Sequence, residues 1–471
     1  MRTQTGLAAG PALHIPAERA IIGLFTVTVL FGLMAFGAAR LEVQALLTIC
    51  SAILGAVTVC LYGIPATSRP LAAAAFAIAG FLAALALLQT IDLSAIGVSN
   101  PAWDEADRLT AIGGSHLSVA PAETRSALLQ IAYPFLIFVS GLALSRTDAD
   151  AERLLRGIVI GAGGLAVVTL IGFLVYPDRL MLTDKVHYIG DFTASFVNRN
   201  SAATFLGVTA LALATLAWRD ARDGGLAQGM VPKRQHDRCR RRLVLGGLLA
   251  LLCLTGLMLT RSRGGIAASA VAALALVPLL TGAWHLGRYR FSRATGRRMR
   301  LAGMTIAILA TVLIMWSISG RVQLRAEIQG LGDQRFCIYP LEVRAFAAQL
   351  LAGYGFGTFA QAFPAFRDGA CGIDGIFQRG HNVYLEGLMG FGLSFALAAG
   401  YGFYRLAATF FIGWRQRRSA RHYAALGFAV LALVLVHSAV DFSVQLPGMA
   451  GYLAALLAPL CALSLMRNRR G

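Results

Sequence analysis

The sequence predicts an all-α polytopic membrane protein with about 12 transmembrane helices and one large segment of short helices outside the membrane. Of its 471 residues, 57% are hydrophobic and only 14% are charged, whereas about a quarter of the residues of a soluble protein are charged. Long apolar runs recur along the chain, and each can cross a hydrocarbon core of roughly 30 Å. The hydrophobic core is therefore expected to be the helix bundle itself.

The expected spans can be taken in chain order. The first apolar run is longer than the corresponding region of a signal peptide, so we expect it to remain as a helix. Nine spans are expected within residues 20–319 and three within 382–466. They are 20–39, 43–64, 71–90, 127–145, 155–176, 201–218, 243–259, 265–283, 301–319, 382–404, 423–440 and 448–466.

Basic residues gather in alternate connecting segments, which predicts the orientation of the spans. These segments hold 28 of the 42 Lys and Arg residues. Short cytoplasmic loops are rich in Lys and Arg, so both termini, residues 1–19 and 467–471, are expected in the cytoplasm. The net charge of +19 is then a signal of topology and of contact with membrane lipids. We expect no nucleic-acid partner.

The opposite, outer side receives the segments 91–126, 177–200, 260–264, 320–380 and 441–447. The segment 320–381 is too long for a simple connector. Helical periodicity around residues 342–351 is interrupted by the glycine run GYGFG at 353–357. We expect short amphipathic helices that lie on the membrane surface and form a catalytic segment.

Several polar side chains lie at the start of the expected tenth span: Arg379, His381, Asn382 and Glu386. A histidine, an amide and a carboxylate at the mouth of a membrane helix are costly to keep dry. They are either ordinary interfacial and capping residues or parts of a binding site. Their convergence with other polar residues on the same side favours a site.

Arg261 and Arg263 lie in a tight outer turn, TRSRGG at 260–265. They are exceptions to the rule that basic residues gather on the inner side. Their guanidinium groups either reach the interface as snorkelling side chains or clamp a phosphate or diphosphate, which the planar fork of arginine suits. Arg335 is a second candidate for the same role.

Two further pairs lie at outer helix ends. His437 and Asp441 are four residues apart, so a helix places them on one face. Asn198 and Asn200 precede the sixth span. Each pair either binds sugar hydroxyls or serves the fold, as an interhelical hydrogen bond or as a helix cap.

Other patterns are discounted. The acidic residues of DAD at 148–150 are expected to favour a helix N-terminus, and the glycine run lacks the lysine of a phosphate-binding loop. We expect no metal and no cofactor. Cys337 and Cys371 are the cysteines of the outer segment. They either close a loop of about 35 residues as a disulfide or remain free thiols.

Five outer motifs occur in a set order: FVNRN (196–200), TRSRGG (260–265), Arg335 followed by GFGTF (355–359), RGHNVYLE (379–386) and HSAVDF (437–442). Together they resemble the O-antigen ligase and polymerase family of bacterial envelope glycosyltransferases, over about residues 195–450. The resemblance implies a transferase of the bacterial inner membrane whose active site faces the periplasm. Its donor would be a glycan linked to undecaprenyl diphosphate, used without metal or nucleotide.

The resemblance places the essential arginines of the family on Arg263 and Arg335 and its loop histidine on His381. The arginines would neutralise the diphosphate leaving group. The histidine would accept the proton of the acceptor hydroxyl, and one in-line displacement would invert the anomeric carbon. One departure is Tyr339, where the family often has a tryptophan.

Substrate contacts are expected from Arg261, Arg379, Asn382, Glu386, Asn198, Asn200, His437 and Asp441. The acceptor is either another lipid-linked glycan, as in a polymerase of O-antigen or exopolysaccharide, or lipid A-core, as in a ligase. GFGTF and the His437 to Asp441 pattern favour the polymerase. Other polysaccharide assembly proteins are expected partners. A flippase for lipid-linked sugars is the alternative from another class, but it needs charged groups near the bilayer midplane, and these spans have almost none.

Overall fold

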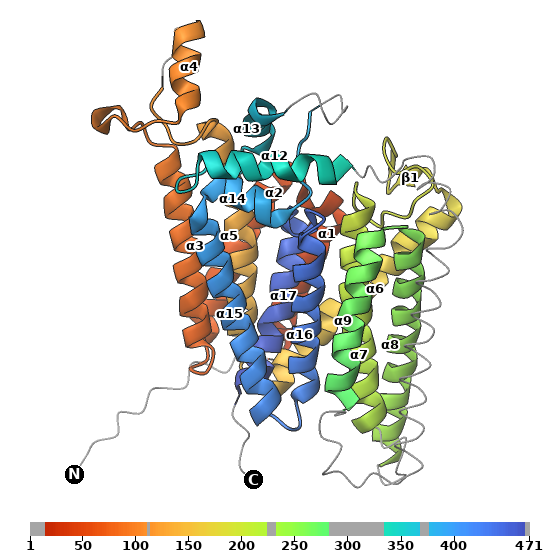
Figure 1. The fold of residues 1–471 in the computed structure, drawn as a ribbon. Helices are drawn as coiled ribbons and strands as arrows, with labels where there is room; N and C mark the ends of the chain where they lie inside the picture. Colours follow the sequence, from red (N-terminus) through yellow and green to blue (C-terminus); the bar gives the residue numbers. More distant parts are fainter. Residues whose placement is uncertain (1–14, 111–113, 224–231, 282–333, 368–375, 467–471) are drawn as a thin grey trace, which may run out of the picture.

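The computed structural model describes residues 15–110, 114–223, 232–281, 334–367 and 376–466 as a bundle of α-helices (Figure 1). Eleven helices of this described part are long and apolar enough to cross a membrane. The all-α polytopic membrane fold is confirmed. The strands among the described residues form a single small antiparallel pair, β1 (Arg179–Leu180) and β2 (Thr183–Asp184), with Arg179 opposite Asp184.

The long helices follow the predicted order. They are α1 (Ile15–Met34), α2 (Leu41–Tyr62), α3 (Arg69–Gln89), α5 (Pro121–Leu144), α6 (Asp148–Val175), α7 (Arg199–Asp223), α8 (Lys233–Leu259), α9 (Arg263–Thr281), α15 (Leu393–Gln416), α16 (Arg421–Ser438) and α17 (Pro447–Leu465). Ten of the predicted spans each correspond to one of these helices. The span predicted for 301–319 lies outside the described residues.

The single span predicted for 382–404 is wrong. A short helix, α14 (Val383–Phe391), ends before Gly392, and the spanning helix α15 begins after it. Gly392 has φ = +63°, and a Cβ on it would overlap the carbonyl oxygen of Leu350. The backbone of another segment therefore fits against this glycine, and the positive φ interrupts the helix. His381 consequently precedes a short helix at the end of the bundle.

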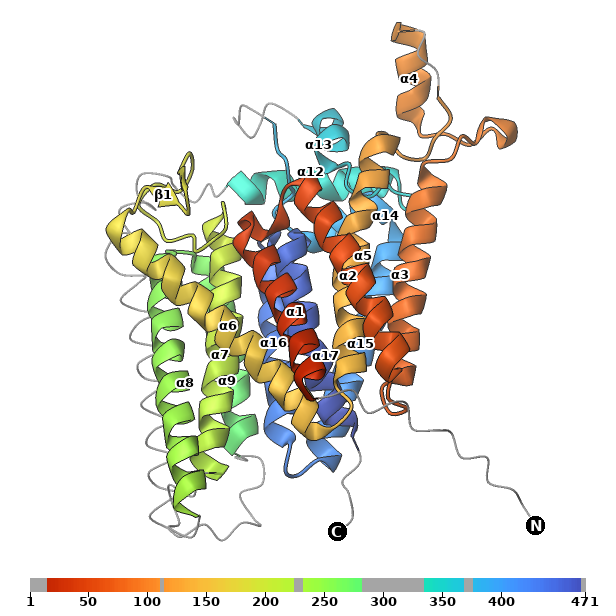
Figure 2. The ribbon, with the colours of Figure 1, turned by 180° about the vertical axis from the view of Figure 1, so that it is seen from behind.

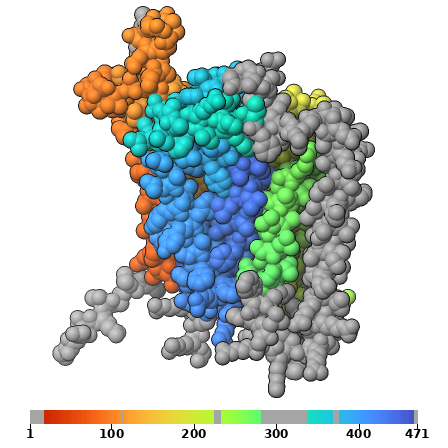
Figure 3. Space-filling model, in the orientation of Figure 1, coloured from red at the N-terminus to blue at the C-terminus, as the bar shows by residue number. Residues whose placement is uncertain are grey.

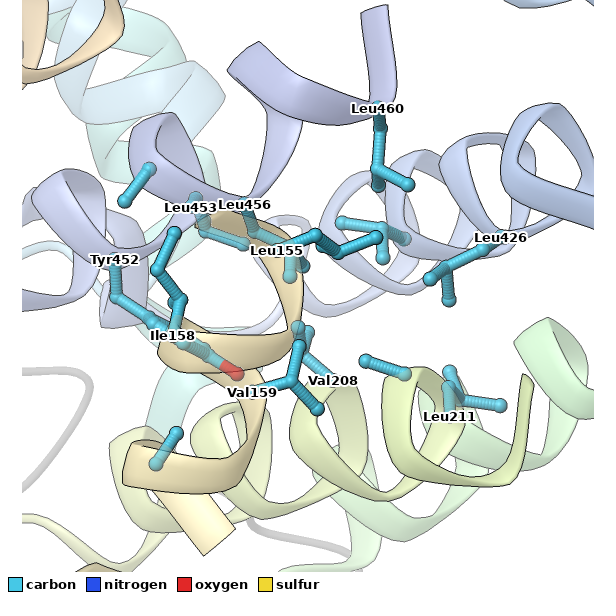
Figure 4. Packing of buried hydrophobic residues seen from close by; sticks show 14 of the residues in the cluster. Leu155, Ile158, Val159, Val208, Leu211, Leu426, Tyr452, Leu453, Leu456 and Leu460 are labelled. Atoms are coloured by element: carbon cyan, nitrogen blue, oxygen red, sulfur yellow. The ribbon is translucent and has the colours of Figure 1, made fainter. Parts of the chain in front are cut away.

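Helix α7 lies at the centre of the half of the bundle formed by α6 to α9. It packs against α6, α8, α9 and α16. In its most apolar stretch of 18 residues, 89% of the residues are buried, whereas the corresponding share for α15 is 17%. Figure 4 shows how α6, α7, α16 and α17 interlock through their apolar side chains. The residues labelled there are Leu155, Ile158, Val159, Val208, Leu211, Leu426, Tyr452, Leu453, Leu456 and Leu460.

Small residues bring α9 close to α7. A Cβ on Gly207 would overlap Ser269 Oγ, and one on Gly265 would overlap the Cβ of Ala203. Helices in membranes associate through such close contacts at small side chains. The contact at Gly265 fixes the turn between α8 and α9 against the start of α7.

The two ends of the bundle differ. We call the end that carries α12, α13 and α14 the site end, and the other the opposite end (Figure 1). Helix α1 begins and α17 ends at the opposite end, which the view from behind also shows (Figure 2). Arginines cluster there at helix ends, in agreement with the predicted alternation: Arg146, Arg153, Arg156, Arg219, Arg222, Arg234, Arg238, Arg415, Arg417 and Arg421.

Short helices cover the site end. Helix α12 (Gln334–Ala348) lies across it, and Figure 3 shows α12 above α15. Helix α13 (Phe359–Ala362) and the 3₁₀ turn η4 (Phe363–Phe366) follow. These elements share a second apolar core of Ile338, Leu341, Ala345, Tyr354, Phe359, Ala362, Phe363 and Met389. The predicted short helices of this segment are present where the structure describes it.

The glycine run at 353–357 serves close packing. Gly353, Gly355 and Gly357 all have positive φ, and a Cβ on Gly353 would lie 2.6 Å from the backbone of Gly390. Gln89, fully buried at the end of α3, donates to the carbonyls of Ala352 and Gly390. The run therefore holds the short helices onto α14 and α3.

Three further short elements connect the long helices: the 3₁₀ turns η1 (Phe36–Ala38), η2 (Ser94–Ile96) and η6 (Ser443–Gln445). Helix α4 (Pro101–Thr110) projects away from the bundle at the site end (Figure 1). It is anchored by Trp103, whose Nε1 donates to the carbonyl of Ser118. The sequence analysis missed both this helix and the β1–β2 pair.

Candidate functional site

Asp441 is the centre of a polar network at the site end. Its side chain is 1% exposed. Oδ1 accepts a hydrogen bond from Asn200 Nδ2 at 2.9 Å and lies 4.0 Å from His381 Nδ1, while Oδ2 accepts from the backbone N–H of Ser443 at 2.8 Å. Residues more than 240 positions apart along the chain thus meet at one carboxylate.

Asn200 joins this network to the α8–α9 turn. Its Oδ1 accepts a hydrogen bond from Ser262 Oγ at 2.8 Å, and Ser262 Oγ accepts one from the backbone N–H of Gly265. Asn198 Oδ1 accepts from the backbone N–H of Asn200 at 2.7 Å, as a residue capping the start of α7 does. Asn198 therefore shapes the helix start, and Asn200 connects two of the predicted motifs.

His437 is buried beside the same turn. Its Nδ1 lies 2.6 Å from Thr204 Oγ1, and a Cβ on Gly264 would lie 3.4 Å from its Nε2. The imidazole therefore packs between α7 and the first turn of α9. The predicted pairing of His437 with Asp441 is indirect, because each residue bonds to a different residue of α7.

His381 has an unusual backbone for its residue type. Its φ is +56°, a left-handed conformation that is uncommon outside glycine. Tyr339 Oη donates to the His381 carbonyl at 3.2 Å, and the imidazole packs edge-on against Phe442 with ring centroids 5.0 Å apart. Tyr339 thus helps to hold the backbone of the histidine. The side chain remains 25% exposed.

The residues on either side of His381 are also held. Glu386 Oε1 accepts a hydrogen bond from Arg379 Nη1 at 3.1 Å, and its Oε2 accepts one from the backbone N–H of Gly380 at 2.8 Å. Asn382 caps α14 by accepting from the N–H groups of Tyr384 and Leu385. Arg379, Glu386 and Asn382 therefore fix the loop that presents the imidazole.

A cavity of about 140 Å³ adjoins this loop. Arg379 and Glu386 line it together with Gln130, Phe356 and Gln445. The side-chain oxygen of Gln445 has no hydrogen-bond partner among the described residues. The cavity thus offers polar groups and an aromatic ring next to the loop that carries His381.

A second acidic centre holds arginines of two motifs. Asp191 accepts hydrogen bonds from Arg199 Nη1 at 2.6 Å and from Arg261 Nη1 at 2.9 Å. The Asp191 side chain is 5% exposed, whereas Arg261 is 46% exposed. The sequence analysis missed Asp191 and Arg199, although Arg199 stands inside the motif FVNRN. An arginine between the two candidate asparagines was the available signal.

The two predicted catalytic arginines begin helices at the site end. Arg263 is exposed at the first position of α9, and it has no ion pair with any other described residue. Arg335 lies in the first turn of α12, and its side chain lies outside the described residues. Their shared proximity to His381 stays a prediction.

Glu342 is a buried carboxyl group that the sequence analysis did not single out. It is 0% exposed, and neither carboxyl oxygen has a hydrogen-bond partner in the described part of the chain. A Cβ on Gly380 would lie 2.7 Å from Glu342 Oε1. Burial, with a smaller contribution from the charge of Glu386, raises the pKa of Glu342 to about 9. Glu342 is therefore neutral near pH 7.

We expect Glu342→Gln to stabilise the protein increasingly as the pH rises. The raised pKa means that folded Glu342 keeps its proton between about pH 4.5 and 9 while the unfolded chain loses it, so wild-type stability falls across this window. Each unit of difference between the pKa values in the folded and unfolded chain changes the free energy of unfolding by up to about 1.4 kcal/mol. At pH 8 we therefore expect the free energy of unfolding of the variant to exceed that of the wild type by at least about 1 kcal/mol. Thermal unfolding at pH 5 and pH 8 measures it. An equal gain at both pH values would contradict the burial of a neutral acid.

The acidic patterns discounted above have other partners. Asp148 pairs with Arg417 at 2.8 Å, and Asp150 with Arg153 at 3.2 Å. In the described ranges, no three His, Cys, Asp or Glu side chains are arranged to hold a metal ion. Cys337 is disulfide-bonded. Cys371, which the sequence offers either as its partner or as a free thiol, lies outside the described residues.

Comparison with known proteins adds one finding to this geometry. Residues 248–399 match a family model described as O-antigen ligase. The match spans Arg261, Arg263, Arg335 and the loop around His381, whereas Asn200 and Asp441, which the structure brings to that loop, lie outside it. No curated protein matches the chain.

Proposed function

From the premise that this chain belongs to the O-antigen ligase and polymerase family, with residues 248–399 forming the matched domain, we propose that it transfers a glycan from undecaprenyl diphosphate to an acceptor hydroxyl. The membership supports a membrane glycosyltransferase of the ligase or polymerase type. One observation carries the finer proposal: His381 and Asn200 meet at Asp441, and Asn200 also accepts a hydrogen bond from Ser262.

His381 is assigned the role of general base. The acceptor oxygen attacks the anomeric carbon, its proton passes to the imidazole, and the bond from that carbon to the diphosphate oxygen breaks. Asp441, at 4.0 Å from Nδ1, favours the cationic imidazole that results. The leaving group departs opposite the attacking oxygen, so the configuration inverts.

The arginines stabilise the leaving group. Arg263 and Arg335 are assigned to the diphosphate, whose charge grows as the glycosidic bond breaks. Arg261 is directed by Asp191 and remains nearly half exposed, so it can also contact the phosphates. The cavity that Arg379 and Glu386 line is assigned to the sugar. Arg379, Asn382, Glu386, Asn198, Asn200 and His437 are assigned as positioning or binding groups.

The site end is assigned to the periplasm and the opposite end to the cytoplasm of a bacterial inner membrane. The clustering of arginines at the opposite end supports this orientation, because cytoplasmic loops are enriched in basic residues. A donor assembled on a lipid carrier would then be used on the outer face.

The acceptor is assigned as a second lipid-linked glycan, which makes the protein a polymerase of surface polysaccharide. Purified full-length protein in vesicles, given a labelled undecaprenyl-diphosphate oligosaccharide alone or together with lipid A-core, tests this. Longer lipid-linked glycans are expected in both cases. Labelled lipid A-core would make the protein a ligase. Movement of the labelled lipid across the bilayer without any new glycosidic bond would overturn the transferase.

We expect transfer to survive excess EDTA without added magnesium or manganese. The proposed arginine clamp supplies the positive charge that a divalent ion supplies in other transferases. Glycan products are measured with EDTA and then with an excess of each ion. Activity lost in EDTA and restored by one ion would contradict the arginine clamp.

A further inference from the structure

Two adjoining cavities of about 440 and 550 Å³ lie at the opposite end of the bundle, between α6, α7 and α8. They share five charged lining residues, which are Glu152, Arg156, Asp220, Arg238 and Arg242. We call both cavities together the α6–α8 pocket. Arg238 is 21 residues before the site end of α8, or roughly 30 Å along a helix. The pocket is therefore separate from the site around His381.

The floor of the pocket is electrically balanced. Arg156 donates from both terminal nitrogens to Asp220, at 2.8 and 2.7 Å, and from Nε to Glu152 at 2.8 Å. Arg219 pairs with Glu152 and with Asp223. The carboxylates of the pocket thus already have cationic partners within the protein.

The rim carries positive charge that is not balanced in this way. Arg238 and Arg242 are one turn apart on α8, both exposed, and neither has a hydrogen bond or ion pair with another described residue. Each cavity is lined by two more arginines than carboxylates. Paired guanidinium groups of this kind suit a phosphate, since their planar forks donate two hydrogen bonds each.

An apolar wall continues from this rim. Ile160 of α6 and Leu245 of α8 line the larger cavity and are 40% and 46% exposed. Beyond them the surface of the same helices stays apolar, with Ile171 and Leu248 more than half exposed. A soluble anion would make no contact with this apolar surface, whereas the acyl chains of a lipid would cover it.

We propose that the α6–α8 pocket binds an anionic glycerophospholipid. Its phosphate lies between Arg238 and Arg242, and its acyl chains run along Ile160 and Leu245 towards the middle of the bundle. Basic pockets between membrane helices are suited to such headgroups. The lipid would fasten α8 to α6 at the end remote from the transfer site.

Native mass spectrometry of the delipidated full-length protein tests the proposal. Phosphatidylglycerol is titrated against phosphatidylethanolamine with the same acyl chains, and glycerol 3-phosphate serves as the soluble phosphate. The double variant Arg238→Gln/Arg242→Gln is compared with Arg240→Gln/Arg241→Gln. The control pair lies on the same helix and loses the same charge, but its residues do not line the pocket. Size-exclusion profiles and glycan transfer show that both variants fold.

We expect phosphatidylglycerol to bind the wild type and the control pair alike, and the pocket variant about 10- to 30-fold more weakly, since each basic group near a membrane contributes about a factor of five. Equal loss in both variants would overturn the proposal in favour of diffuse attraction. Binding of glycerol 3-phosphate as tight as that of the lipid would show a phosphate site without a role for the apolar wall. Equal binding of phosphatidylethanolamine would remove the selectivity for an anion.

Discussion

His381→Asn is expected to lower glycan transfer by about 10²- to 10⁴-fold, the usual cost of losing a general base. Asparagine is the informative replacement, because it tolerates the positive φ that the structure requires at this position. The substitution therefore removes the imidazole ring and keeps the backbone conformation. The hydrogen bond from Tyr339 goes to the backbone carbonyl of His381, so the variant can keep it. Initial rates of product formation in vesicles measure the effect.

His187→Asn is the matched control. His187 is exposed in the connection between α6 and α7 at the site end, and it has no assigned role. It should retain transfer close to the wild-type rate. Losing a general base costs at least about 10²-fold. If His381→Asn kept more than about a tenth of the wild-type rate, the imidazole would therefore not be the base, and the proposed role of Asp441 in stabilising its cation would fall with it.

Arg263→Lys and Arg335→Lys are each expected to reduce transfer by at least about 10-fold, and the corresponding alanine variants by about 10²- to 10³-fold. A lysine keeps the charge but is a point donor, whereas a diphosphate can be held at two oxygens by the guanidinium fork. The loss should appear in the turnover rate at saturating donor, because the charge on the leaving group develops as the bond breaks.

Arg179→Lys is the matched control for this series. Arg179 lies in the β1–β2 pair at the site end, and its ion pair with Asp184 is exposed on both sides. Exposed pairs of this kind contribute little, so transfer should be unchanged. Near-normal turnover in both catalytic lysine variants would mean that the site needs positive charge alone.

Much of the fold followed from local properties of the sequence. The apolar runs and the alternation of basic segments predict the spans without knowledge of their neighbours. The reason is that in a membrane each helix satisfies its backbone hydrogen bonds within its own segment. Ten of the predicted spans appear as single helices for this reason. The break at Gly392 was not readable, since it depends on the backbone around Leu350 approaching that glycine, a contact between segments that the chain order does not reveal.

The site divides in the same way. The sequence alone determined which residue types stand at the ends of the spans: His381 before a helix, arginines in an outer turn, and asparagines before the sixth span. Tertiary structure decided which of them meet. It brought Asn200 and His381 to Asp441 and Ser262 to Asn200. It also buried Glu342 beside Gly380. A hydrogen bond depends on two atoms at about 3 Å, and only the packing of distant helices sets that distance.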